Sequence, residues 1–167
     1  MTLNTEAGLD DIDRRILAEL QENARITFTE LGRRASLTAP AVAERVRRLE
    51  EAGVIAAFRA HLDPARVGYP ITAFVRWTSS GPDCSRLGEV AKEIPEIVEC
   101  HRITGETSYI LKVAARSVQH LEALIDQLMP HGSTITSVVL SSPVVHRALA
   151  PTEAEAEPPR ARRPRSA

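Results

Sequence analysis

Hydrophobic residues in the first sixty positions recur at helical spacing. Apolar side chains repeat every three or four residues between charged ones near the start of the chain, which predicts an amphipathic helix. This stripe consists of Leu9, Ile12, Ile16 and Leu20. Thr27 followed by Glu30 is a capping-box signature and predicts a short second helix. The inward residues of that helix are expected to be Phe28, Leu31 and Ala35.

A third helix and a β-ribbon are predicted to follow. Thr38 can cap the helix, Pro40 is tolerated in its first turn, and Gly53 can end it. Its inward residues are expected to be Val42, Val46 and Leu49. Val54 and Ile55, and then the segment 57–62, predict two short strands. Three helices and a ribbon in this order indicate a winged helix-turn-helix.

The hydrophobic period changes after Asp63 and Pro64. Apolar segments predict strands at 71–78, 97–104, 109–115 and 135–140, with a turn at 81–83. Two helices are expected between them, one stopped by Pro95 and one capped by Ser117. Their inward residues are expected to be Leu87, Val90, Ala91 and Ile94, then Val118, Leu121, Leu124, Ile125 and Leu128. This order predicts an α+β fold, a βαββαβ (ferredoxin-like) sandwich with both helices on one sheet face.

These patterns divide the chain into three parts. We expect a winged helix-turn-helix domain at 1–62, a βαββαβ domain at 63–149 and a disordered tail at 150–167. The tail contains arginines that either add phosphate contacts or belong to a solubilising extension: Arg160, Arg162, Arg163 and Arg165. The open sheet face needs covering, which predicts self-association through the second domain. Residues available for it are Phe74, Val98, Ile110, Val138 and Leu140.

Charge and composition narrow the range of partners and compartments. With 21 basic and 22 acidic residues the formal net charge is −1, so nucleic-acid binding would need a local basic face. Cys84 and Cys100 are too few for a disulfide scaffold, which fits a reducing compartment. No apolar run approaches the roughly 20 residues of a membrane helix, and the amino end is polar and acidic. We therefore expect a cytoplasmic protein that is not inserted in a membrane.

Enzymatic chemistry is not indicated. The sequence has no Ser/His/Asp order, no Gly-rich phosphate loop and no H-E-x-x-H spacing. Glu99, Cys100 and His101 are adjacent, but strand alternation sends Cys100 to the face opposite the other two. We predict no catalytic residue, no metal site and no cofactor.

The third helix is the candidate for reading DNA. A rotation of 100° per residue places Pro40, Ala41, Glu44 and Arg48 opposite the core face, with Arg45 and Arg47 on the flanks. Small residues near its capped start allow close backbone approach, and arginines can bond guanine or phosphate. The predicted DNA-binding set is Thr38, Ala39, Pro40, Ala41, Glu44, Arg45, Arg47 and Arg48. Two alternatives are a solvated helix face, with arginines paired to Glu44, Glu50 and Glu51, and a winged helix used for protein contacts.

Several sequence segments resemble the Lrp/AsnC (feast/famine) transcriptional regulators of bacteria and archaea. In the first half they are LDDIDRRIL (9–17), NARITFTEL (23–31), RVRRLEEAGVI (45–55) and VGY (67–69). In the second half they are ITG (103–105), YILKV (109–113) and TSVVLSSP (136–143), which resemble parts of the ligand-responsive RAM domain of that family. The resemblance runs in order over roughly 9–149 and leaves out the tail.

The resemblance implies a regulator with a DNA-binding domain and an assembly domain. Its partners would be double-stranded DNA and further copies of the chain, as a homodimer and often as an octamer of four dimers. The recognition helix would be 39–51, and the helix-turn-helix would span about 27–46. Small effectors, usually amino acids, would bind near the loop after the second strand of the RAM domain. The candidate effector residues are Thr104, Gly105, Glu106, Thr107, Ser108, the bordering Tyr109, Thr136 and Ser137.

One position departs from the leucine-responsive branch of the family. Many of its members have an aspartate where this chain has Ser108, whereas members resembling the asparagine-responsive branch also have serine. Glu106 could supply the negative charge for an ammonium group, and Gly105 could allow close backbone approach to a carboxylate. The competing interpretation of 105–108 is a simple hairpin turn. The competing function is an oligomeric small-molecule-binding protein without productive specific DNA binding.

Overall fold

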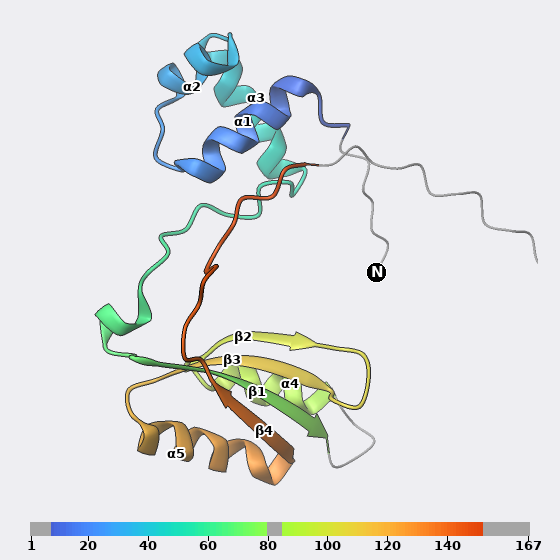
Figure 1. The fold of residues 1–167 in the computed structure, drawn as a ribbon. Helices are drawn as coiled ribbons and strands as arrows, with labels where there is room; N and C mark the ends of the chain where they lie inside the picture. The colour runs from blue at the N-terminus through green and yellow to red at the C-terminus, as the bar shows by residue number, and fades with distance from the viewer. Residues whose placement is uncertain (1–7, 80–84, 152–167) are drawn as a thin grey trace, which may run out of the picture. The chain divides into compact units, whose positions relative to one another are not determined.

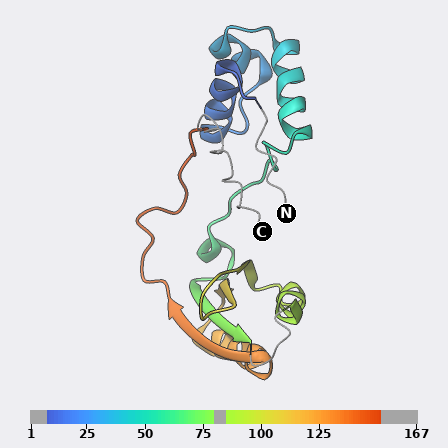
Figure 2. The same cartoon turned by 90° about the vertical axis from the view of Figure 1, so that its right-hand side faces the viewer.

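The computed structural model describes residues 8–79 and 85–151, which form two compact units. Of the described residues, 8–59 and 146–151 belong to the first unit, and those between Ala60 and Val145 belong to the second. The carboxyl-terminal segment therefore returns to the first unit, as the trace after the last strand shows (Figure 2). The predicted turn at 81–83 lies outside the described residues, as do residues 152–167 of the tail predicted at 150–167.

Three helices make up the amino-terminal unit: α1 (Asp11–Glu22), α2 (Phe28–Ala35) and α3 (Ala39–Glu51) (Figure 1). Their buried residues are Ile16, Leu17, Leu20, Leu31, Ala35, Val42, Val46 and Leu49. The predicted helices and most of their inward faces are confirmed. The prediction for Phe28 is wrong, because this first residue of α2 lies at the end of the helix, outside the buried cluster, and is 43% exposed.

Side-chain caps begin all three helices. The Thr38 hydroxyl accepts the Ala41 N–H at the start of α3, and the Thr27 hydroxyl accepts the Glu30 N–H at the start of α2. A complete capping box occurs at α1, where Asp10 and Asp13 each accept the backbone N–H of the other. Each cap satisfies an N–H group that the helix leaves without an intrahelical acceptor.

The predicted β-ribbon after α3 is wrong. Residues 54–62 contain no strand, although they lie in the described part of the chain. The N–H groups of Val54 and Ile55 both donate to the Leu49 carbonyl, at 2.9 and 3.0 Å. These bonds close the end of α3 after Gly53, whose φ is +71°, and Val54 and Ile55 pack on the helical core. The apolar pair therefore belongs to a helix-ending turn, and the unit is a helix-turn-helix without a wing.

The second unit has the predicted order of elements. A short 3-10 helix, η1 (Pro64–Val67), precedes β1 (Ile71–Ser79), α4 (Ser85–Glu93), β2 (Ile97–Arg102), β3 (Tyr109–Ala115), α5 (Val118–Leu128), η2 (Met129–His131) and β4 (Gly132–Val138). The strands form one antiparallel sheet in the order β2-β3-β1-β4. Both helices cover the same face of this sheet (Figure 1). The ferredoxin-like α+β sandwich is confirmed.

The sheet buries one face and leaves the other open. Ala73, Val75 and Trp77 of β1 alternate toward the helices and pack with residues of β3, α4 and α5. On the opposite face Phe74 is 40% exposed and Ile135 is 56% exposed. Val118 was expected to face inward, but it is the first residue of α5 and is exposed. No helix in the described part of the chain is long and apolar enough to span a membrane.

Candidate DNA interface and effector site

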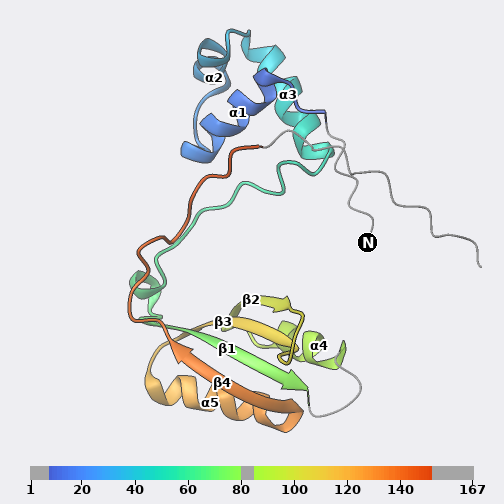
Figure 3. The same cartoon turned by 45° about the vertical axis from the view of Figure 1, so that its right-hand side comes forward.

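The turn between α2 and α3 depends on one glycine and one left-handed residue. A Cβ on Gly32 would lie 2.6 Å from the Leu37 carbonyl oxygen, so only glycine allows the turn to approach α2 this closely. Ser36 ends α2 with a φ of +58°, and the Leu37 N–H donates to the Gly32 carbonyl at 2.8 Å. This geometry sets the angle between the two helices of the helix-turn-helix (Figure 3).

Of the predicted outward face of α3, Pro40, Glu44 and Arg48 are exposed and Ala41 is half-buried. Val42, Val46 and Leu49 are buried, whereas Glu44, Arg47 and Arg48 are exposed. Pro40 lies in the first turn, after the Thr38 cap, and its missing N–H costs no helical hydrogen bond there. The start of α3 therefore presents small side chains and the positive end of the helix dipole.

Arg45 is fastened to α1 and does not extend freely from α3. Its Nη1 lies 2.7 Å from Asp10 Oδ2 and 2.8 Å from Asp13 Oδ1. Asp13 is only 3% exposed, so Arg45 balances a buried carboxylate. The Asp13 backbone N–H, and then Arg45, hold the pKa of Asp10 below its ordinary value. Arg45 thus ties α3 to the start of α1.

Arg47 and Arg48 differ in their surroundings although both are exposed. Arg47 Nη2 lies 2.5 Å from Glu44 Oε1, and its Nη1 pairs with Glu51. Arg47 in turn lowers the pKa of Glu44. The side chain of Arg48 makes no hydrogen bond or ion pair among the described residues, although its charge adds to the lowering of the Glu44 pKa. The alternative of a solvated helix face, with arginines paired to glutamates, therefore applies to Arg47. Arg48 is the arginine of α3 whose side chain is available to a ligand.

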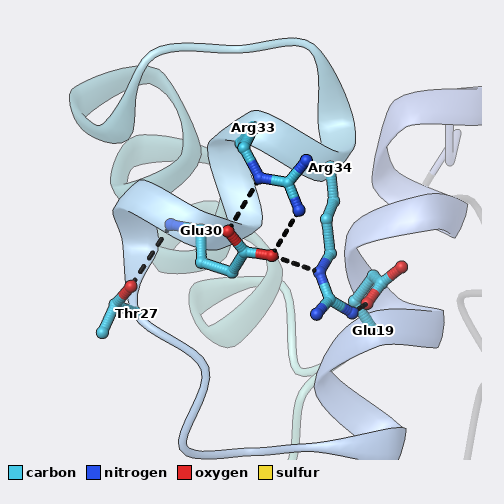
Figure 4. Close-up of polar contacts among 5 residues, drawn as sticks. All are labelled: Glu19, Thr27, Glu30, Arg33 and Arg34. Atoms are coloured by element: carbon cyan, nitrogen blue, oxygen red, sulfur yellow. Dashed lines mark hydrogen bonds and ion pairs between the residues drawn. The ribbon is translucent and has the colours of Figure 1, made fainter.

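A second arginine network joins α2 to α1 (Figure 4). Glu30 accepts from Arg33 Nη2 at 2.7 Å and from Arg34 Nε at 2.8 Å, while Arg34 Nη1 reaches Glu19 Oε2 at 2.6 Å. Arg33, and then Arg34, lower the pKa of Glu30 to about 2. The Glu30 side chain therefore binds arginines, and the capping box predicted with Thr27 forms only its hydroxyl half.

The loop after β2 combines a turn with a backbone tie to β1. Gly105 has a φ of +108°, the conformation for which glycine was expected. The Ser108 N–H donates to the Trp77 carbonyl at 3.1 Å, and the Ser108 hydroxyl accepts the Ser79 N–H at 3.3 Å. Thr104, Gly105 and Glu106 are exposed, whereas Ser108 is half-buried. Ser108 thus anchors the loop to β1, while Glu106 is exposed to solvent.

Thr136 and Ser137 do not lie on the same face of the sheet. Thr136 is opposite Val75, whose side chain faces the helices, and Ser137 is opposite Phe74 on the open face. Because neighbouring strand residues alternate, one pocket within a subunit cannot take both side chains. The structure therefore separates these two candidate contacts.

A pocket of about 480 Å³ lies between α4 and β2. Tyr109 and Arg102 line it, together with small and apolar residues such as Gly88 and Ala91. Of the candidate effector residues, only Tyr109 is among the described residues that line this pocket. The exposed loop and the pocket are thus adjacent at Tyr109 but are separate features.

The register of β2 separates the three reactive side chains as predicted. Glu99 and His101 pair with Lys112 and Ile110, while Cys100 pairs with Leu111 on the other face. Glu99 accepts from Lys112 Nζ at 2.8 Å. Within the described residues, no three His, Cys, Asp or Glu side chains gather as they would around a metal ion.

Two family models together cover most of the folded chain. Residues 9–50 match the AsnC-type helix-turn-helix domain, and residues 72–149 match the Lrp/AsnC ligand binding domain. The uncharacterized HTH-type transcriptional regulator YezC of Bacillus subtilis is 42% identical over 140 residues, which cover 84% of this chain and 99% of that protein. The chain belongs to the Lrp/AsnC family of transcriptional regulators.

Solved Lrp/AsnC structures have the same fold. LrpC of Bacillus subtilis is 35% identical with a TM-score of 0.78, over 83% of this chain and 99% of that one. The feast or famine regulatory protein from Mycobacterium tuberculosis, complexed with L-methionine, is 35% identical with a TM-score of 0.82, over 86% and 99% of the two chains. A transcriptional regulator from Neisseria meningitidis in complex with L-methionine is 30% identical with a TM-score of 0.79, over 84% and 96%.

Proposed function

We propose that this Lrp/AsnC regulator binds a specific double-stranded DNA site through α3 in response to an amino acid. The DNA-binding part of this proposal rests on Arg48. Its guanidinium is exposed and forms no ion pair within the described part of the chain, and it lies on the face of α3 opposite the buried residues. A guanidinium in a major groove can bond guanine or neutralise a phosphate. Arg45 acts as a positioning residue in this proposal, since contacting DNA would remove it from the buried Asp13.

The remaining predicted contacts form two groups. Short side chains at the start of α3 would let the helix come close to the DNA, and they belong to Thr38, Ala39, Pro40 and Ala41. Arg47 would exchange Glu44 and Glu51 for phosphate oxygens, which adds a desolvation cost to its contact. The three arginines of α3 are balanced by Glu44, Glu50 and Glu51, so we expect a modest dependence of affinity on salt.

The amino-acid half of the proposal rests on the ligand-binding domain and on relatives that bind L-methionine. An amino acid has an ammonium and a carboxylate, which Glu106 and the backbone at Gly105 are suited to meet. If the amino acid binds one assembly or conformational state more tightly than another, its binding would shift the protein toward that state and so change its affinity for DNA. The cytoplasm is the compartment that such a role requires.

Homo-oligomerisation through the open sheet face completes the proposal. Phe74 and Ile135 are exposed on that face, and a dimer would place two recognition helices on DNA half-sites about one helical turn or a multiple apart. Phe74→Asp should lower the assembly state in sedimentation, whereas Val118→Asp, a change of an exposed apolar residue on α5, should leave it unchanged. Equal sedimentation of both variants and the wild type would contradict this interface.

The function is tested by gel-shift titration of the protein on its own upstream DNA and on scrambled DNA, with each amino acid in turn. We expect a specific shift that one amino acid alters. A specific shift that no amino acid alters would reject the effector assignment. Absence of any specific shift would reject DNA binding and favour the small-molecule-binding oligomer.

A further inference from the structure

A side-chain amide on α1 holds the chain's own carboxyl-terminal segment by its backbone. Gln21 Nε2 donates to the Leu149 carbonyl at 2.9 Å, and the Leu149 N–H donates to Gln21 Oε1 at 2.8 Å. About two turns nearer the start of α1, Arg14 Nη1 donates to the Pro151 carbonyl at 3.3 Å. We call residues 147–151 the clasp.

The clasp is held through its main chain and not through an apolar side chain. Leu149 is 78% exposed, so burial of this leucine contributes little. Gln21 instead uses both its donor and its acceptor on one residue, as a neighbouring strand would. Main-chain recognition of this kind tolerates changes of the Leu149 side chain but requires its N–H.

The clasp borders an apolar groove of the DNA-binding unit. A pocket of about 460 Å³ is lined by residues of α1 and of the segment after α3, including Leu17, Leu20 and Phe58. Leu149, Ala150 and Pro151 line the same pocket. The groove and the clasp therefore form one docking site within the amino-terminal unit.

The clasp also has a covalent connection to the ligand-binding unit. Residues 139–146 lead to it directly from β4, and the Val139 N–H still donates to the Thr72 carbonyl of β1 at 2.8 Å. The other connection between the units is the chain that passes from Arg59 to Ala60. With the clasp docked, the DNA-binding unit is attached at two places, which restricts its independent motion.

We propose that the clasp is a releasable second tether, docked on α1 through Gln21, that links the motion of the DNA-binding unit to β4. Each released hydrogen bond should make the docked state about fivefold less populated. The tether can open without unfolding either unit, because no buried core residue belongs to it. This proposal does not depend on which DNA or effector the protein binds.

Hydrogen–deuterium exchange of the full chain tests the docking. Gln21→Ala removes both hydrogen bonds of this side chain to Leu149, so peptides spanning 144–151 should exchange about 25-fold faster than in the wild type. Gln127→Ala is the matched control, since that amide donates only to Ala123 of its own helix, and it should change nothing. Exchange in the wild type at the rate of a free peptide of this sequence, or equal rates in wild type and Gln21→Ala, would overturn the docking.

Tryptic cleavage after Arg59 tests the tether. Leu149→Pro removes the N–H that Gln21 binds, whereas Leu149→Ala keeps it. Cleavage should be severalfold faster in Leu149→Pro and Gln21→Ala than in Leu149→Ala and wild type, with unchanged circular dichroism. Faster exchange of 144–151 without faster cleavage after Arg59 would show a docked segment that restrains nothing and would overturn the tether.

Discussion

The two units of the protein complete their cores in different ways. In the DNA-binding unit three helices surround one buried cluster, and ion pairs at its edge join α1 to α2 and α3. In the ligand-binding unit two helices cover one sheet face, while Phe74 and Ile135 stay exposed on the other. The first unit is therefore complete within one chain, and the second presents a surface that a further copy can cover. Substitutions in the two units should therefore differ in their effects on stability.

The largest expected effect is in the covered face of the sheet. Leu111 is fully buried, so Leu111→Ala should lower the free energy of unfolding by about 3 kcal/mol through lost burial and a residual cavity. Ile135→Ala, on the open face, should cost less than about 1 kcal/mol under conditions where the chain is monomeric. Urea unfolding at low protein concentration measures both values. Similar losses would mean that the open face is already covered.

The next effect separates a structural arginine from a surface one. Arg45→Ala should destabilise the DNA-binding unit by about 2 kcal/mol, because it leaves Asp13 buried without its cation. Arg47→Ala should leave the melting temperature nearly unchanged, since Arg47 and its partners are exposed to solvent. Thermal unfolding of the two variants provides the test. Equal melting temperatures would reject the positioning role of Arg45.

The smallest effect on stability is a dependence on pH. The pKa of Asp10 is lower in the folded state, so its stabilisation is present above its ordinary value of 3.8 and is lost as the pH falls through the folded value. Asp10→Asn keeps a capping side chain but cannot ionise. Its melting temperature should lie below that of the wild type above about pH 4, and the gap should close toward pH 2.

Asp11→Asn, a change of an exposed residue in the first turn of α1, serves as the control for this titration. A gap between Asp10→Asn and wild type that stays constant with pH would contradict the ionised pair with Arg45. A similar closing gap in Asp11→Asn would assign the effect to the helix terminus in general.

Much of the fold could be predicted because local spacing determines it. The buried faces of α1 and α3 and the bounds of β3 follow from periods of 3.6 and 2 residues. The same spacing predicted that Phe28 and Val118 face inward, but each is the first residue of its helix, lies beyond the core and is exposed. The prediction of a wing was wrong because the N–H groups of Val54 and Ile55 donate to a carbonyl at the end of α3. The hydrophobic pattern does not reveal these hydrogen bonds.

The candidate sites depended more on contacts that sequence spacing does not encode. Arg45 finds Asp10 and Asp13 more than thirty residues away, and a helical wheel shows only that it flanks the core. Strand alternation would have separated Thr136 from Ser137 in advance, and the pairing of β1 with β4 now assigns each one its face. The clasp had no signal in the sequence, since Gln21 recognises a main chain.

The most direct test of the central claim is the DNA affinity of Arg48→Ala as a function of salt. On the protein's own upstream DNA, affinity should fall about tenfold and the salt slope by about one relative to wild type. Arg15→Ala removes an exposed arginine of α1 whose side chain makes no hydrogen bond or ion pair among the described residues, and this variant should bind as the wild type does. Equal affinities and slopes for Arg48→Ala and Arg15→Ala would contradict the assignment of α3 as the DNA-reading helix.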